Sequence, residues 1–217
     1  MMPSSPAVRR ARLGQSAYLK RCIALFPLGL LAALASHAAA APCPTGLPSN
    51  THCLTGADTA GAHYWVAVPA AWSGVLVLHA HGGPELGEPR AERSAQDLQR
   101  WAVMVRAGYA WAGSTYRQGG VAVRAAAEDT ERLRGLFTEL VVKPRVTLLH
   151  GQSWGASVAA IATETYPSNY DAMLLTSGVL GGDTRSYEFR LDLRVVYQAL
   201  CCSRRPKTEP LMRAVPI

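Results

Sequence analysis

The sequence predicts an α/β fold, a three-layer sandwich in which helices cover a mostly parallel sheet. Two observations lead to this prediction. From residue 51 onward, short apolar runs alternate with longer stretches of helical periodicity. Of the 217 residues, 49% are hydrophobic and 17% are charged, a composition suited to one buried core and unlike that of disordered chains.

Six runs have the length and residue types of strands: 51–55, 63–68, 75–80, 109–114, 146–150 and 172–176. The first helix is predicted to begin at Ser94, with Asp97 as a capping-box partner, and to end at Gly108. A second helix is predicted over 121–140, with Glu128 and Arg132 as an ion pair, and a third after Trp154. The last three strands each follow a helix, which predicts parallel crossover connections.

Residues 1–40 have the features of a secretory signal peptide. A basic stretch is followed by an apolar run from Cys22 to Ala35 and by small residues that end in Ala38-Ala39-Ala40. The run of about fourteen residues is shorter than the roughly twenty that a membrane span needs. We predict cleavage after Ala40 and export to the periplasm or the extracellular space, so the membrane is contacted only through this segment. A retained anchor is the alternative.

The net charge of +7 comes mainly from the predicted signal peptide. Five of the 22 basic residues and none of the 15 acidic ones lie in residues 1–40, so 17 basic residues remain against 15 acidic ones. A chain cleaved after Ala40 therefore carries only +2. A strongly acidic partner such as nucleic acid is not expected.

Export would allow the four cysteines outside residues 1–40 to oxidise. Four cysteines permit three pairings, and we favour Cys43 with Cys53, which closes a short loop. Cys201 and Cys202 are adjacent, so a direct bond between them would be strained. No His/Cys cluster has the spacing of a zinc site, and neither a metal nor a cofactor is expected.

The motif Gly151-Gln152-Ser153-Trp154-Gly155 lies between the fifth predicted strand and the third predicted helix. A G-x-S-x-G pattern alone arises by chance with a probability on the order of 0.1 in a chain of this length. Here it has the strand-turn-helix context that a nucleophile elbow requires. Side chains at Gly151 and Gly155 would collide with the neighbouring strand and helix. The motif therefore predicts Ser153 as a nucleophile held above the sheet.

The run His79-Ala80-His81-Gly82-Gly83-Pro84 follows the third predicted strand. Acyl transfer places negative charge on the former carbonyl oxygen, and each fixed donor to that oxygen contributes about 3 kcal/mol. We predict that the backbone N–H of Trp154 and that of Gly82 or Gly83 form this oxyanion hole. His81 is predicted to support the loop.

Found together and in this order, the two motifs resemble those of the α/β-hydrolase superfamily, and more narrowly of its secreted bacterial esterase-like members. The resemblance covers residues 50–200, and residues 184–194 are similar to the segment that leads from the sixth strand into the cap region. It implies a carboxylic-ester hydrolase that forms an acyl-serine intermediate from a small ester or amide substrate.

The catalytic acid and base of that superfamily follow the serine in the chain. All six histidines of this sequence precede Ser153. Asp183, in a predicted Gly-Gly-Asp turn after the last strand, is the candidate acid, and a solvated turn residue is the alternative reading. A base role for His81 or His150 is less favoured, since His81 supports the loop and His150 is expected to pack inside.

Two functional hypotheses follow from the sequence. The first is an exported serine hydrolase whose triad is incomplete in this chain. The second is a catalytically silent or truncated α/β-hydrolase fragment with at most a binding role. In either case we expect residues 41–200 to form a partial domain without the last strands and 201–217 to form an irregular basic tail. An unpaired sheet edge should then favour self-association.

Overall fold

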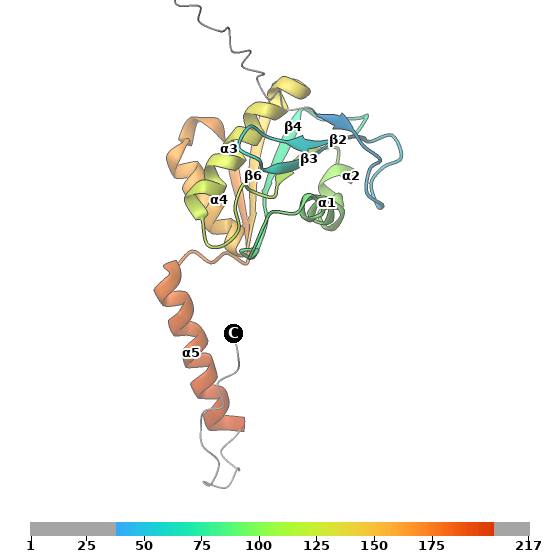
Figure 1. Cartoon of the computed structure of the whole chain (residues 1–217). Coiled ribbons are helices and arrows are strands. Elements are labelled where there is room, and N and C mark those ends of the chain that lie inside the picture. Colours follow the sequence, from blue (N-terminus) through green and yellow to red (C-terminus); the bar gives the residue numbers. More distant parts are fainter. Residues whose placement is uncertain (1–37, 202–217) are drawn as a thin grey trace, which may run out of the picture. The chain divides into compact units, whose positions relative to one another are not determined.

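The structure, a computed structural model, describes residues 38–201 (Figure 1). The basic and apolar parts of the predicted signal peptide and the predicted tail from residue 202 onward lie outside the described residues. The side chain of Asp183 also lies outside them.

A seven-stranded sheet forms the centre of the described part, in the order β1-β2-β3-β5-β4-β6-β7. Its strands are β1 (Ala39–Ala40), β2 (His52–Ala57), β3 (His63–Val68), β4 (Val75–Ala80), β5 (Ala110–Ser114), β6 (Val146–Gln152) and β7 (Ala172–Thr176). All six predicted strands are present, with ends that differ from the predicted ends by at most two residues. The two-residue strand β1, which contains the predicted cleavage residue Ala40, was not expected.

The sheet combines an antiparallel and a parallel part. Strands β1, β2 and β3 pair antiparallel, and β3 also pairs antiparallel with β5. Strand β4 pairs parallel with both β5 and β6, and β6 pairs parallel with β7. The predicted parallel crossovers to the last three strands are therefore confirmed, within a sheet that is mixed.

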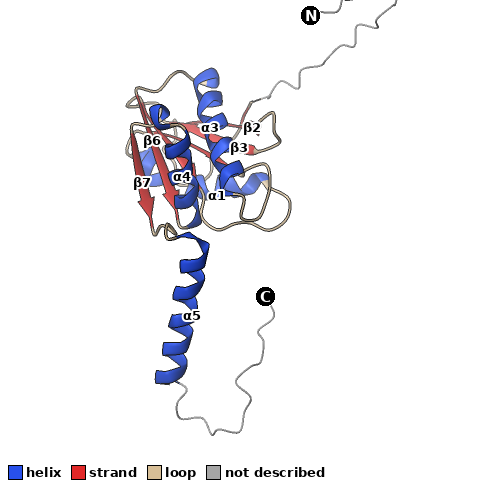
Figure 2. Ribbon diagram, turned by 90° about the vertical axis from the view of Figure 1, so that its left-hand side faces the viewer, coloured by secondary structure: helices blue, strands red, loops and turns tan. Residues whose placement is uncertain are grey.

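The helices are α1 (Ala91–Arg100), α2 (Ala102–Arg106), α3 (Val123–Leu140), α4 (Trp154–Thr165) and α5 (Gly182–Cys201), with a 3₁₀ turn at Pro167–Asn169. Helices α1 to α4 cover the two faces of the sheet (Figure 2). Alternate residues of β4 show this, because Leu76 and Leu78 join the core on the α3 and α4 side, whereas Val77 joins the core on the α1 and α2 side. The predicted three-layer α/β sandwich is confirmed.

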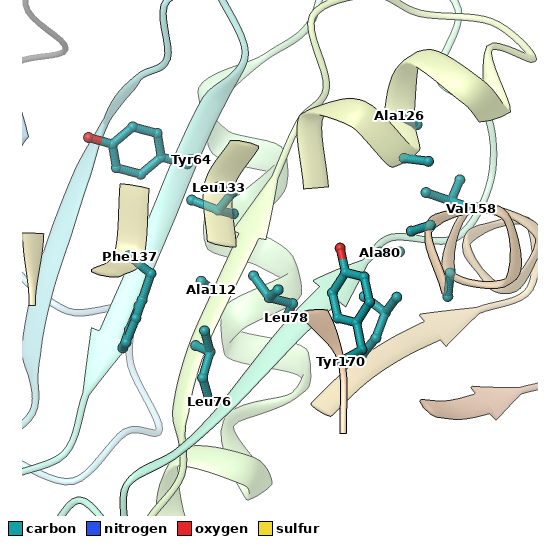
Figure 3. Packing of buried hydrophobic residues seen from close by; sticks show 14 of the residues in the cluster. Tyr64, Leu76, Leu78, Ala80, Ala112, Ala126, Leu133, Phe137, Val158 and Tyr170 are labelled. Atoms are coloured by element: carbon teal, nitrogen blue, oxygen red, sulfur yellow. The ribbon is translucent and has the colours of Figure 1, made fainter. Parts of the chain in front are cut away.

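The larger core lies between the sheet and helices α3 and α4. Leu76 and Leu78 of β4 lie beside Ala112 of β5, and Phe137 of α3 packs over this part of the sheet (Figure 3). Leu133 and Phe137 are buried, as the predicted apolar face of this helix requires. This packing fixes β4 and β6 in the middle of the sheet, where both candidate motifs begin.

The predicted first helix differs from the observed one. Helix α1 begins at Ala91 after Arg90, and Ser94 and Asp97 are buried inside it instead of capping it. The chain then breaks at Trp101 (φ −100°, ψ 19°), so the predicted single helix is two helices. The capping-box prediction was wrong because Ser94 and Asp97 lie on the face that the sheet buries. Gly108 ends α2 with φ 85°, as predicted.

A disulfide joins Cys43 to Cys53 of β2, with a Cα–Cα distance of 5.4 Å. It attaches the segment before β2 to that strand, and Cys53 is buried against the smaller core. Cys201 is exposed and forms no disulfide within the described residues.

Strand β7 is the other edge of the sheet over residues 38–201. Met173 and Leu174 on this strand are 41% and 54% exposed. This is the edge at which we predict self-association. No helix among the described residues is both long and apolar enough to span a membrane.

Candidate active site

Ser153 lies at a sharp turn between the end of β6 and the start of α4. Its backbone has φ 54° and ψ −119°, a left-handed conformation that costs a non-glycine residue about 1–3 kcal/mol. The Ser153 N–H donates to the Thr176 carbonyl at 2.9 Å, and the Ser153 carbonyl accepts from Ala156 and Val179. Strand β7 and the loop after it therefore hold a strained turn of the kind that presents a nucleophile.

The two glycines of the motif lie where side chains would collide with neighbouring backbone. A Cβ atom at Gly151 would lie 2.5 Å from the Gly155 carbonyl oxygen and 2.7 Å from the Ala156 Cα. A Cβ atom at Gly155 would overlap the carbonyl oxygens of Ala80 and His81. The start of α4 thus packs directly against the loop that follows β4.

The structure brings the two motifs together at Gly82. A Cβ atom there would lie 2.9 Å from the Gln152 carbonyl oxygen and 3.3 Å from the Ser153 Cβ. Helix α4 begins at Trp154, so the Trp154 N–H is among the first amides that have no partner within the helix. Backbone donors from the Gly82 loop and from the helix N-terminus are therefore neighbours of Ser153, an arrangement that can stabilise an oxyanion.

His81 is buried and stacks on Tyr116, with 4.4 Å between the ring centroids. Its Nδ1 lies 3.3 Å from the Gly82 carbonyl oxygen. Burial lowers the pKa of His81 to about 4, so the ring is neutral at pH 7. The ring therefore fills the base of the loop, and no hydrogen bond joins it to the Ser153 hydroxyl among the described residues.

His79 and His150 form a buried pair on neighbouring strands. Their Nδ1 atoms are 2.9 Å apart, and the His150 Nε2 lies 3.2 Å from the Thr176 hydroxyl. Burial lowers the pKa of both rings, that of His150 to about 4. His150 packs inside as expected, and both rings are occupied with partners other than Ser153.

Asp183 is the second residue of α5, not part of a free turn as predicted. The helix begins at Gly182, six residues after the end of β7. Because the Asp183 side chain lies outside the description, its role as catalytic acid stays a prediction. Within residues 38–201, no cluster of His, Cys, Asp and Glu could hold a metal ion.

The sequence interpretation gave Arg93 and Thr176 no role at the site and assigned Asp97 only to a helix cap. Arg93 Nη2 donates to the Gly82 carbonyl at 2.9 Å, and Arg93 Nε lies 3.3 Å from Asp97 Oδ2. The i,i+4 spacing of Arg93 and Asp97 signals an ion pair on one helix. It carries no information on the loop that Arg93 contacts at Gly82, eleven residues earlier in the chain.

A cavity of about 10 Å³ lies beside the loop and is lined by His81, Glu85, Tyr116, Gly119 and Trp154 among others. A space of this size holds about one water molecule. It therefore admits no group as large as a typical substrate.

The buried histidines predict a loss of stability in acid. His81 and His150, each with a pKa of about 4, bind protons in the unfolded chain near 6.5, so their stabilisation is lost as the pH falls from 6.5 to 4. Burial raises the pKa of Asp97 to about 6, which offsets part of this loss below pH 6. Burial also lowers the pKa of His79, which adds to the loss. We expect the free energy of unfolding, measured with urea, to fall by at least about 2 kcal/mol between pH 7 and 5.

Two variants test whether the buried histidines cause this loss of stability. His81→Gln should reduce the fall in unfolding free energy between pH 7 and 5, because one buried titrating ring is removed. His52→Gln, at an exposed position on β2, should leave the fall unchanged. An equal fall in the wild type and in His81→Gln would contradict the assignment.

The sequence matches no protein-family model and no curated protein. Among solved structures it is similar to acetyl xylan esterase 1 from Thermoanaerobacterium sp. (15% identity, 79% of this chain and 63% of that chain, TM-score 0.49). It is also similar to an acetyl xylan esterase from Paenibacillus sp., with 17% identity, 78% of this chain and 64% of that chain covered, and a TM-score of 0.47. A cold-adapted esterase from an Arctic intertidal metagenomic library is similar too, with 17% identity, 65% of each chain covered, and a TM-score of 0.46. The chain spans less than two thirds of the length of each of these structures.

Proposed function

We propose that this chain provides the nucleophile and the oxyanion loop of a serine carboxylic-ester hydrolase of the α/β-hydrolase type. One observation carries the proposal, namely the close approach of Gly82 to Ser153 at a strained strand-turn-helix junction, where a Cβ atom at Gly82 would meet the Ser153 Cβ. Seventy residues of chain lie between Gly82 and Ser153, and packing brings them together where an acyl-transfer reaction needs both.

In the proposed reaction the Ser153 Oγ attacks the ester carbonyl carbon and forms a tetrahedral oxyanion. The Trp154 N–H and one N–H of the Gly82-Gly83 loop stabilise the oxyanion. The bond to the alcohol oxygen then breaks, the alcohol leaves with the proton that the Ser153 hydroxyl gave up on attack, and the acyl group stays on Ser153. Water attacks the acyl-serine, releases the carboxylic acid and restores the hydroxyl. Asp183 is the proposed acid that orients a base.

The proposal includes export and a small ester or amide as substrate. The order of basic, apolar and small residues in the first 40 positions supports export. The Cys43–Cys53 disulfide supports it as well, since such bonds persist in oxidising compartments.

A second candidate function is a silent chain that at most binds a ligand. The burial and the hydrogen-bond partners of the histidines in and beside the two motifs favour it. His79, His81 and His150 are buried and have lowered pKa values, and none of them has a hydrogen bond to the Ser153 hydroxyl within residues 38–201. A serine without a base is a weak nucleophile at neutral pH.

Fluorophosphonate labelling separates the two candidates. We expect the folded chain to be labelled and the Ser153→Ala variant to show only background, because the probe reacts with an activated serine oxygen. Ser73→Ala is the control, since this exposed hydroxyl donates to Gly108 away from the elbow and its loss should leave labelling intact. A folded chain without labelling, checked by circular dichroism, would favour the silent chain.

A further inference from the structure

The carbonyl group of Gly82 is held by two side chains. Arg93 Nη2 donates to its oxygen at 2.9 Å, and His81 Nδ1 lies 3.3 Å from the same oxygen. The Arg93 side chain is 22% exposed, so its guanidinium approaches this carbonyl largely shielded from water. A charge-assisted bond from a guanidinium is stronger than one between neutral groups.

Fixing this carbonyl also fixes the next amide. In a planar trans peptide the C=O of one residue and the N–H of the following residue point in opposite directions, and residues 38–201 contain no cis peptide bond. The Gly82 oxygen points to Arg93, so the Gly83 N–H points away from Arg93. Two adjacent glycines would otherwise rotate freely, and Gly83 has φ 72°.

Arg93 is itself held in place. Its Nε lies 3.3 Å from Asp97 Oδ2 and 3.5 Å from Glu85 Oε1. Asp97 is 3% exposed, and its Oδ2 lies 3.9 Å from the Nε2 of His79. The guanidinium therefore has two carboxylates on one side and the Gly82 carbonyl as its third partner.

The same group of side chains continues to the elbow. His79 contacts His150, and His150 contacts the Thr176 hydroxyl. The Thr176 carbonyl accepts the Ser153 N–H at 2.9 Å. A row of mostly buried polar side chains thus lies between the Gly82 loop and the nucleophile turn. It is not an unbroken chain of hydrogen bonds, because Arg93 Nε and His79 Nε2 have no hydrogen-bond partner among the described residues.

We infer that Arg93 is a positioning residue that fixes the Gly82-Gly83 peptide and thereby selects the Gly83 N–H as the oxyanion donor of this loop. The orientation of the peptide stands on the hydrogen bonds alone. Its catalytic consequence rests on the proposed function.

The orientation is tested by NMR on the full chain, without any need for activity. Arg93→Met keeps most of the side-chain length and removes the donor. We expect the carbonyl ¹³C resonance of Gly82 and the amide resonance of Gly83 to move, and the Gly83 amide to exchange faster with solvent. Arg90→Met is the matched control, because Arg90 also pairs with Glu85 but is 66% exposed. Unchanged Gly82 and Gly83 resonances in folded Arg93→Met would overturn the inference.

The consequence is tested by the rate of fluorophosphonate labelling of Ser153. We expect Arg93→Met to lower the rate by about 10- to 100-fold, less than the loss of a whole oxyanion donor. Added guanidinium ion at millimolar concentration should restore part of the rate, which a merely structural defect would not allow. Arg93→Lys should lower the labelling rate less than Arg93→Met does, because one ammonium can still reach either Gly82 or Asp97. It replaces the methionine variant if that variant fails to fold.

The NMR and labelling measurements test the two parts of the inference independently. No labelling of the wild type together with the expected NMR shifts would reject the proposed hydrolase and keep Arg93 as a residue that orients the loop. Normal labelling of Arg93→Met in spite of shifted resonances would reject its role in selecting the donor.

Discussion

Replacing Asp129 with alanine is expected to lower the free energy of unfolding by about 3 kcal/mol. The Asp129 carboxylate is fully buried in α3 and accepts the Arg117 backbone N–H at 2.8 Å and the Arg117 guanidinium at 2.9 Å. Arg132, which also contacts Asp58, is its third donor. Burial raises the pKa of Asp129 even beside these donors, so the charge depends on all of them.

Two further variants separate the buried charge from surface pairing. Asp129→Asn keeps the shape and one acceptor oxygen, and should lose part of the stability that Asp129→Ala loses. Glu128→Gln removes the neighbouring carboxylate, which pairs with Arg117 on the exposed side, and should have little effect. Urea unfolding followed by circular dichroism measures all three variants. Equal losses in Asp129→Ala and Glu128→Gln would contradict the buried role of Asp129.

Replacing Gly155 with alanine is expected to have the second large effect, because it adds a methyl group where two backbone oxygens already lie. The new Cβ would overlap the carbonyl oxygens of Ala80 and His81, and backbone cannot move aside as a flexible side chain can. We expect a loss of about 3 kcal/mol in unfolding free energy, at the upper end for overpacking. The loop that carries Gly82 would also be pushed from Ser153, so labelling should fall by about 100-fold, as for a lost oxyanion donor.

Gly135→Ala is the matched control for Gly155→Ala. Gly135 lies inside α3, and a Cβ there would meet nothing within 4 Å. The same chemical change should therefore stabilise the protein by about 0.5–1 kcal/mol, since alanine favours the helix. Gly155→Ala with wild-type stability and labelling would contradict the packing of the elbow against the loop.

The sequence was most informative where structure depends on neighbouring residues. The strands β2 to β7 follow from short apolar runs, and the elbow follows from a G-x-S-x-G motif between a strand and a helix. Both signals are local in the chain. They also placed Ser153 and Gly82 at the ends of β6 and β4, which pair in the sheet.

Contacts between distant segments could not be predicted in this way. The expected Glu128–Arg132 pair does not form, because Glu128 pairs with Arg117 and Arg132 turns to Asp58 and Asp129. The predicted helix start at Ser94 was wrong for a related reason, since the sheet buries that residue. Arg93 has no motif of its own, and its role depends on a carbonyl that only the folded chain brings near.

The strand order determines when the candidate site can form during folding. Strand β4 lies between β5 and β6, and its contact with β6 joins His79 to His150 across 71 residues of chain. Closing so long a loop is entropically unfavourable until other contacts compensate, so such pairings form slowly. The Arg93–Gly82 hydrogen bond joins residues close in the chain, whereas the approach of the Gly82 loop to Ser153 depends on the pairing of β4 with β6. We therefore expect the nucleophile and its oxyanion donors to come together late in folding, once β6 and then β7, which holds the Ser153 turn, have joined the sheet.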